Sequence, residues 1–498
     1  MSSSVMGAQS AIAIQQLVDM RNQFNDLQRQ ISTGQKSTNY AGLGLNRGVT
    51  VSLNAQLSAI TGYDSTISTV STRIDLMNTV FTRMSDMGST MRQAMVTANA
   101  TSDASGAITA QTTAQMSLDE LLGLLNTDAG GRYLFSGRAT DTPAVDSYDH
   151  ILNGDGTRAG LKQIISERAQ ADVGANGLGR LTVTQPTATS VSVTEDAGVF
   201  GFKLASANST LSNATVTGPS GSPAALSVDF TGTPTDGEAF TLRLTLPDGS
   251  SQNLTLTATT NSPPGANQFT IGATAAATAA NFQSALSSGL GNLAATSLKA
   301  ASAVAASNEF FAADANNPPQ RVAGPPFDTA TALTAGSAAD TVIWYTGEAG
   351  SDSARGTAVA RIDQSLAVPY GARANEAGLR NLVQNIATLA AVTLSPSDPN
   401  AGGFSLALNQ RLSANLTGSG LQGLTDIAAE LASAQTSLNA AKTRHQQTSM
   451  TLSDFLQQVS GVSNEEVGSK ILALQTRMQA SMQTTAMLFQ TSLVNYLK

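Results

Sequence analysis

The side chains that could do acid–base or metal chemistry are few in this sequence, and their spacing is unsuited to it. The 498-residue chain has no cysteine, which excludes thiol nucleophiles, disulfides and thiolate metal sites. Its two histidines, His150 and His445, lie far apart, so a three-histidine zinc site is impossible. His150 lies in a turn-like stretch and His445 on an apolar helical stripe. We expect both to be packed or solvated side chains, with no catalytic role.

Adjacent carboxylates and a glycine-rich loop are the remaining candidates for chemistry. Glu465–Glu466 and Glu195–Asp196 are neighbours in sequence, and such neighbours do not share a helix face, so we expect solvated pairs. The segment 42–48 superficially resembles a phosphate loop. Its third glycine is one position late for G-x-G-x-x-G and no strand precedes it, which favours a helix-breaking loop. The sequence therefore predicts no enzyme, no cofactor and no metal.

Charge and hydropathy restrict the possible partners. The net charge is 27 − 35 = −8, which argues against broad nucleic-acid binding. No apolar run reaches the roughly 18 residues of a membrane span, so we expect no membrane partner. The first residues have neither a basic start nor an apolar stretch, so no secretory signal peptide is expected.

Proline divides the chain into three parts. None of the 15 prolines comes before Pro143 or after Pro399, and 11 lie between residues 181 and 345. Because proline disrupts helix interiors, both ends are free to be helical and the middle is not. We predict a mainly α coiled-coil stem formed by both termini, with a β-rich (α+β) inserted domain in the middle. The predicted parts are an N-terminal arm (1–40), a helical stem with a β-hairpin around 131–150 (41–180), a β-rich variable insert (181–345), a returning helical stem (346–464) and a C-terminal arm (465–498).

Both arms have the alternating spacing of three and four residues that marks helices packed side by side. The simplest arrangement pairs the first arm with the last and the second helix with the penultimate one. Each arm is short and poor in charge pairs, and such helices are marginal alone, so we expect both to order only on assembly. The predicted assembly seam consists of Leu17, Met20, Phe24, Leu27 and Ile31 in the first arm, and Val467, Ile471, Leu474, Met478 and Leu488 in the last.

A second stripe continues along the inner helices. On the N-terminal side it includes Met77, Met84, Met91 and Met95, which could form a groove for a partner or pack into a core. We favour core packing. On the C-terminal side the stripe runs from Leu424 through His445 and Phe455 to Val462.

Strand periods replace helical ones in the middle of the chain. Apolar and polar residues alternate over 239–258, interrupted by the turn sequence Pro-Asp-Gly at 247–249, which predicts a β-hairpin. The alanine-rich stretch 275–306 could be helical, and 341–345 has the composition of a strand.

Four stretches, at residues 24–36, 131–143, 361–376 and 481–497, carry a resemblance to the bacterial flagellin superfamily. The run from Phe24 to Lys36 (FNDLQRQISTGQK) is similar to the end of that family's first helix, and the run from Ser481 to Leu497 is similar to its last helix. The run from Gly131 to Pro143 (GRYLFSGRATDTP) resembles hook–filament junction proteins, also called hook-associated protein 3. The run from Arg361 to Glu376 looks like the alphaproteobacterial members of that group.

The resemblance implies a non-enzymatic structural subunit of the bacterial flagellum that is exported through the flagellar type III apparatus and is extracellular. It also implies its partners, which are copies of itself in a ring or helical layer, an adjacent hook-associated protein, filament flagellin and an export chaperone. Filament flagellin itself is the alternative reading. A third reading, from a different class, is a surface adhesin or binding module with the insert as its ligand site.

Overall fold

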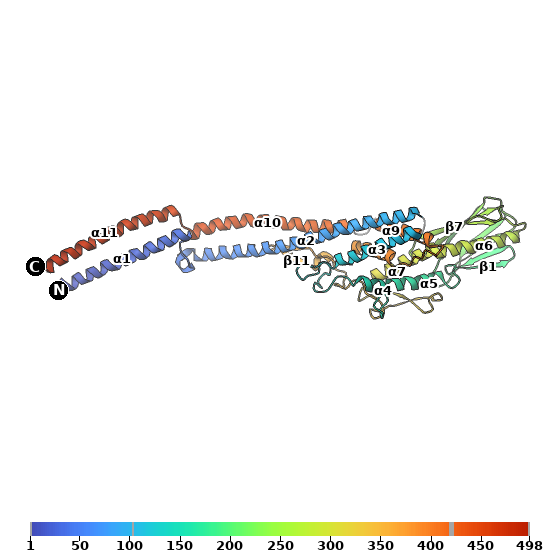
Figure 1. The fold of residues 1–498 in the computed structure, drawn as a ribbon, viewed down its shortest axis with the longest axis horizontal. Helices are drawn as coiled ribbons and strands as arrows, with labels where there is room; N and C mark the ends of the chain where they lie inside the picture. Colours follow the sequence, from blue (N-terminus) through green and yellow to red (C-terminus); the bar gives the residue numbers. More distant parts are fainter. Residues whose placement is uncertain (1, 102–103, 418–422, 497–498) are drawn as a thin grey trace. The chain divides into compact units, whose positions relative to one another are not determined.

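The computed structural model describes residues 2–101, 104–417 and 423–496 (Figure 1). The chain separates into two compact units. The first, here called the terminal unit, comprises Met1–Ser71, Ala360–Val368 and Gln435–Lys498. The second, here called the body, comprises Thr72–Val359 and Pro369–Ala434.

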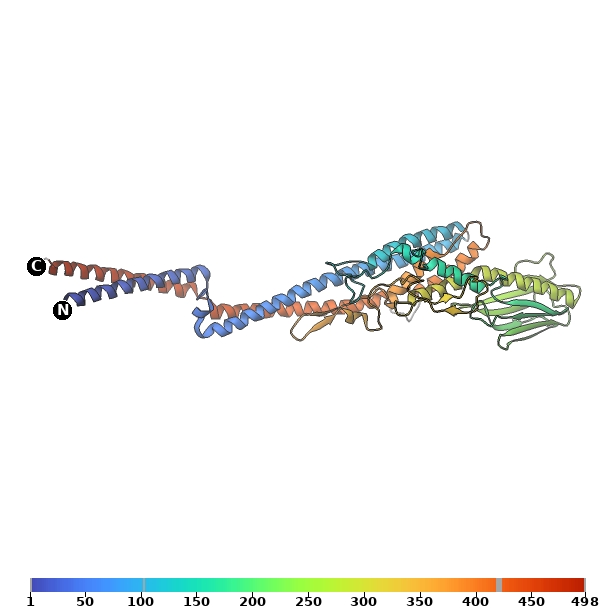
Figure 2. The same cartoon turned by 90° about the horizontal axis from the view of Figure 1, so that it is seen from below.

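The terminal unit is built mainly from helices at the two ends of the chain. Helix α1 packs along helix α11, so the two ends of the chain lie side by side (Figures 1 and 2). The unit's elements are α1 (Ser2–Thr33), the 3-10 helix η1 (Tyr40–Asn46), the first part of α2 (Arg47–Thr101), the second part of α10 (Leu424–Ser460), α11 (Asn464–Tyr496) and most of the hairpin of β11 (Val359–Arg361) and β12 (Ala367–Pro369).

Side-chain contacts also pair α2 with α10 inside the terminal unit. Ser71 accepts a hydrogen bond from the Gln435 amide at 3.1 Å, and Asp64 lies 2.8 Å from His445 Nδ1. The residue number rises along α2 as it falls along α10, so the two helices are antiparallel. The nested pairing predicted from the apolar spacing is therefore confirmed, first arm with last and second helix with penultimate.

A main-chain clasp joins the two places where these helices are interrupted. Gly34, with φ +69°, ends α1 in the left-handed region that glycine adopts without strain. The Lys36 amide donates to the Ser460 carbonyl at 2.8 Å, and the Val462 amide donates to the Gly34 carbonyl at 3.1 Å. Both partners of the coil therefore change direction at the same level.

The helical part of the body packs against one face of the continuation of α2. All four methionines of the predicted stripe, from Met77 to Met95, are buried, so the prediction of core packing is confirmed. Trp344 is fully buried, and its indole Nε1 donates to the Phe311 carbonyl at 3.0 Å. The other helices are α3 (Ala104–Leu125), α4 (Tyr148–Asn153), α5 (Leu161–Val173), α6 (Ala275–Leu293), the π-helix η2 (Ala294–Leu298), α7 (Lys299–Ala312), η3 (Ala354–Thr357), α8 (Ala377–Ala391) and α9 (Ala401–Thr417).

Two four-stranded sheets form the β-rich part of the body. Their orders are β1-β2-β5-β4 and β3-β6-β7-β8, and α6 contacts strands of both. Phe282 of α6 is at the centre of their shared core, with the rings of Phe230, Phe240 and Phe269 packed edge-on around it. The strands are β1 (Thr182–Thr187), β2 (Ser190–Thr194), β3 (Lys203–Ser209), β4 (Ala214–Ser220), β5 (Ala225–Phe230), β6 (Ala239–Thr245), β7 (Ser251–Thr259) and β8 (Gln268–Thr270), followed by the separate pair β9 (Arg321–Val322) and β10 (Leu333–Thr334).

The structure confirms the predicted fold class, a helical stem with a middle β-rich region, and several of its elements. The hairpin predicted over 239–258 is the β6–β7 pair, with Ala239 opposite Thr257. The alanine-rich stretch is α6, η2 and most of α7.

Three local predictions are wrong. No β-hairpin forms around 131–150, because Ser136 and Val145 make isolated bridges to Arg373 and Tyr345 instead of pairing within the segment. Residues 341–345 likewise make only bridges at their two ends and form no strand. Phe455, placed on the buried stripe by its spacing, is 54% exposed.

Candidate assembly surface

Both histidines have structural partners. The Nδ1 atom of His150 lies 2.9 Å from Asp146 one turn away, and the side chain is partly exposed. His445 is buried in the terminal unit, where its Nδ1 contacts Asp64 and its ring lies 5.9 Å from that of Tyr63. In the part of the chain that the structure describes, no group of three or more His, Asp or Glu side chains could hold a metal ion.

The adjacent carboxylates also serve the fold. Glu195 accepts hydrogen bonds from the amides of Leu204 and Ala224, which ties neighbouring strands together. Ser463 caps the start of α11 by accepting from the Glu466 amide at 3.3 Å. A hydrogen bond from Lys470 lowers the pKa of Glu466, and two ionised carboxylates in the first turn suit the positive end of the helix dipole.

The predicted seam residues of the two arms are buried to different extents between α1 and α11. Val467 and Leu474 are buried, which places them inside the pair. Ile31 is exposed, and the side chain of Leu488 lies outside the described residues. The other seam residues, Leu17, Met20, Phe24, Leu27, Ile471 and Met478, are half-buried.

A second set of apolar side chains on the arms lies outside this pair. Leu472 is 66% exposed although Leu474, two residues on, is only 6% exposed. Two helices in contact can each bury one stripe, so apolar residues on another face stay in water. This set, here called the outer apolar face, consists of Ile14 and Val18 on α1 and Leu472 and Met482 on α11; Ile12 is exposed too, but it lies on the opposite side of α1 from Ile14.

The arms have no net charge that would oppose packing against one another. Each arm helix has two acidic and two basic residues, so each sums to zero, whereas the whole chain has a net charge of −8. Apolar, uncharged helix surfaces that remain exposed mark places of contact with another molecule. The charged residues are Asp19, Arg21, Asp26 and Arg29 in α1, and Glu465, Glu466, Lys470 and Arg477 in α11.

Sequence reasoning missed the outer apolar face because it followed one stripe per helix. The signal was present, since Ile14 and Val18 break the alternation of three and four residues that begins at Leu17. A helix that is apolar on more than one side is a helix with more than one neighbour.

None of the helices in the described ranges combines the length and apolarity needed to cross a membrane.

Comparison with known proteins identifies one part of the chain. Residues 7–140 match the family model described as the bacterial flagellin N-terminal helical region. The match covers α1, η1, α2 and α3 and extends into the segment that follows α3. A search of curated proteins found no match. The family match supports a place for this chain in the bacterial flagellin superfamily, whose members are structural and self-assemble into the extracellular flagellum.

Proposed function

We propose that this chain is a structural subunit of the bacterial flagellum that assembles with copies of itself through α1 and α11, and that it acts as the hook–filament junction adaptor. The observation that carries the assembly part is the outer apolar face on two helices of zero net charge that already pair with each other. A further copy that packs against this face removes it from water, and burial of apolar surface is the main favourable term in association.

The predicted seam and the outer apolar face have separate roles in this proposal. Buried seam residues such as Leu474 hold α1 and α11 together within one subunit, and exposed residues such as Leu472 contact the next subunit. The half-buried seam residues contribute to both. The neighbours are copies of this chain in a ring or helical layer, an adjacent hook-associated protein on one side and filament flagellin on the other.

The junction assignment rests on the stretch from Gly131 to Pro143, which resembles junction proteins. In the structure this stretch belongs to the body. Phe135 is fully buried and packs edge-on against Phe81 of α2, with 5.7 Å between the ring centroids. Arg138 forms an ion pair with Glu348. We attribute its role to shaping the body beside α2. Export through the flagellar type III apparatus, with a dedicated chaperone, is part of the same proposal.

A deletion strain tests the junction role. Cells that lack this chain but retain the other flagellar genes are expected to release filament protein into the medium and to keep no filaments. Reintroduction of the wild-type chain should restore both filaments and swimming. If this chain is filament flagellin instead, the strain will release no filament protein, and isolated wild-type filaments will consist of it.

A further inference from the structure

One strand of the β-rich region is left with an open edge. Strand β8 covers only the last three residues of β7, with Thr257 opposite Gln268 and Thr259 opposite Thr270. The earlier part of β7, from Ser251 to Leu256, pairs with β6 on one side only. The lane that β8 occupies beside β7 therefore continues as an empty lane along residues 251–256.

The alternation of the ladder shows which main-chain groups face this lane. Ala258 donates its amide to Glu238 on the β6 side, whereas Thr257 donates to Asn267 on the β8 side. Main-chain groups of an antiparallel strand alternate between its two neighbours, so those of Asn253 and Thr255 point the same way as those of Thr257. No residue in the described part of the chain pairs with these two on that side.

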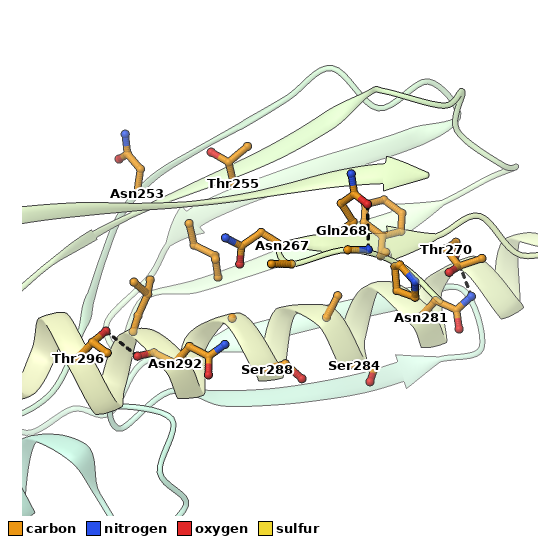
Figure 3. Close-up of a pocket in the computed structure, with 18 of the residues that line it drawn as sticks. Asn253, Thr255, Asn267, Gln268, Thr270, Asn281, Ser284, Ser288, Asn292 and Thr296 are labelled. Atoms are coloured by element: carbon orange, nitrogen blue, oxygen red, sulfur yellow. Dashed lines mark hydrogen bonds between the residues drawn. The ribbon is translucent and has the colours of Figure 1, made fainter. Parts of the chain in front are cut away.

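Helix α6 forms the opposite wall of the lane (Figure 3). Between the wall and β7 lies a groove of about 690 Å³. Amide and hydroxyl side chains line the groove from both sides, and none of its lining residues is charged. On the helical side these are Asn281, Ser284, Ser288 and Asn292 of α6 and Thr296 of η2.

Strand β8 shows how the groove holds an extended segment. Its Thr270 carbonyl accepts a hydrogen bond from the Asn281 amide at 2.8 Å, while its other side forms the ladder with β7. Asn292 lies 11 residues farther along α6, which is about 16 Å of helix. About five residues of β-strand span that distance, the same length as Ser251–Thr255.

We propose that this groove, here called the β7–α6 groove, binds an extended, uncharged segment of another polypeptide as an added strand beside β7. The main-chain groups of Asn253 and Thr255 supply ladder hydrogen bonds, and Ser288 and Asn292 hold the other side of the segment as Asn281 holds β8. Addition of a strand to an open sheet edge is a common mode of peptide recognition. A charged side chain in the groove would lose water without gaining a counter-charge, so the segment is uncharged.

Selection from a displayed library of random heptapeptides against the full chain tests this proposal. The expected peptides are uncharged and rich in residues that favour strands. Asn253→Pro removes the main-chain donor that faces the groove without removing a bond to β6, and proline is tolerated at such edges. We expect it to weaken binding of a synthetic selected peptide at least tenfold, whereas Asn253→Ala, which keeps the donor, leaves binding unchanged.

A second pair of variants and a second measurement guard against misfolding of the proline variant. Ser288→Trp fills the groove and should abolish binding, while Ser288→Ala leaves the groove open and should weaken binding only by the loss of one hydrogen bond. In hydrogen exchange, the amides of Asn253 and Thr255 should exchange faster than that of Leu254 in the free protein and become protected when the peptide binds.

Four results would overturn the proposal. The first two are a library that yields no peptide and a library that yields mainly charged peptides. The third is that the selected peptides bind Ser288→Trp as tightly as the wild type. The fourth is that the amides of Asn253 and Thr255 are already protected from hydrogen exchange in the free protein. Neutral oligosaccharides provide the competing ligand class. If maltoheptaose binds the wild type and Asn253→Pro equally and displaces the peptide, the groove is a saccharide site and no strand is added.

Discussion

Two leucines on α11 test the proposal that contact within a subunit and contact between subunits use different faces of this helix. Leu472 is 66% exposed and Leu474 is 6% exposed, although only Ala473 lies between them. Full burial of a leucine side chain stabilises by about 1.5–3 kcal/mol, so covering the remaining two thirds of Leu472 contributes roughly 1–2 kcal/mol per contact. We therefore expect Leu472→Ala to weaken self-association about 5- to 30-fold, since about 1.4 kcal/mol corresponds to a factor of ten.

The same change should leave the single subunit almost unaffected. Leu474→Ala removes a buried side chain from the α1–α11 pair, with a loss of about 2–5 kcal/mol if that pair is formed before assembly. Sedimentation equilibrium of the purified chain measures self-association, and circular dichroism at 222 nm measures thermal melting of the helices. Thr484→Ala is the control, because Thr484 is exposed on the same helix but is not apolar.

The melting and association data together decide between two alternatives: the arms pair in the monomer, as in the structure, or they are disordered until assembly. If the arms pair in the monomer, Leu474→Ala lowers the melting temperature and Leu472→Ala does not. If they are disordered until assembly, neither variant changes melting, and both weaken association. The reasoning about the outer apolar face is refuted if Leu472→Ala and Thr484→Ala associate equally well, or if the wild type shows no self-association at any soluble concentration.

Three further predictions concern the body. Hydrogen bonds from the amide of Thr235 and from Ser212 lower the pKa of Glu238 below its ordinary 4.5. The ionised carboxylate therefore stabilises the fold above about pH 4.5, and this stabilisation is lost as the pH falls through the lowered pKa. Glu238→Gln should therefore flatten the fall in urea midpoint below about pH 4.5, and an unchanged slope would contradict this account. Phe282→Ala leaves a cavity among three aromatic rings and should destabilise the body by about 3–5 kcal/mol in chemical denaturation, whereas a loss under about 1 kcal/mol would show that the core collapses around it. Excision of residues 182–293 with a short flexible linker should preserve swimming, because Gly179, just before the cut, lies against the side chain of Leu298, just after it. Excision of 181–340 should abolish swimming, because it also removes α7, which packs against α5, α8 and α9, and equal swimming in the two strains would contradict this.

Periodic features were predictable from the sequence. An apolar side chain every three or four residues gave the long helices and their nested pairing, because a single stripe must be covered by a partner. The burial of the methionines from Met77 to Met95 followed from the same rule. The β6–β7 hairpin was predictable because the turn at 247–249 is local in sequence and its strands alternate.

Features that depend on distant parts of the chain were not predictable. Val145 pairs with Tyr345, and nothing in the residues next to Val145 indicates that partner, so a local hairpin was the natural but wrong choice. Strand β8 lies parallel to β7 and is only three residues long, too short for a periodic signal. The outer apolar face was missed because a heptad pattern assigns each helix one neighbour, whereas Leu472 and Leu474 lie on different faces of α11 and only Leu474 is buried.

The clasp between Gly34, Lys36, Ser460 and Val462 has a consequence for how this chain tolerates mutation. Its two amide–carbonyl bonds use main-chain atoms alone, so substitution of Ser460 or Val462 by most other residues leaves them intact. Only a residue without an amide hydrogen removes a donor, which makes proline at position 36 or 462 the damaging replacement. The side chains of Ser460 and Val462 are therefore free to drift over generations without loss of these two bonds, whereas Gly34, with its positive φ, is not.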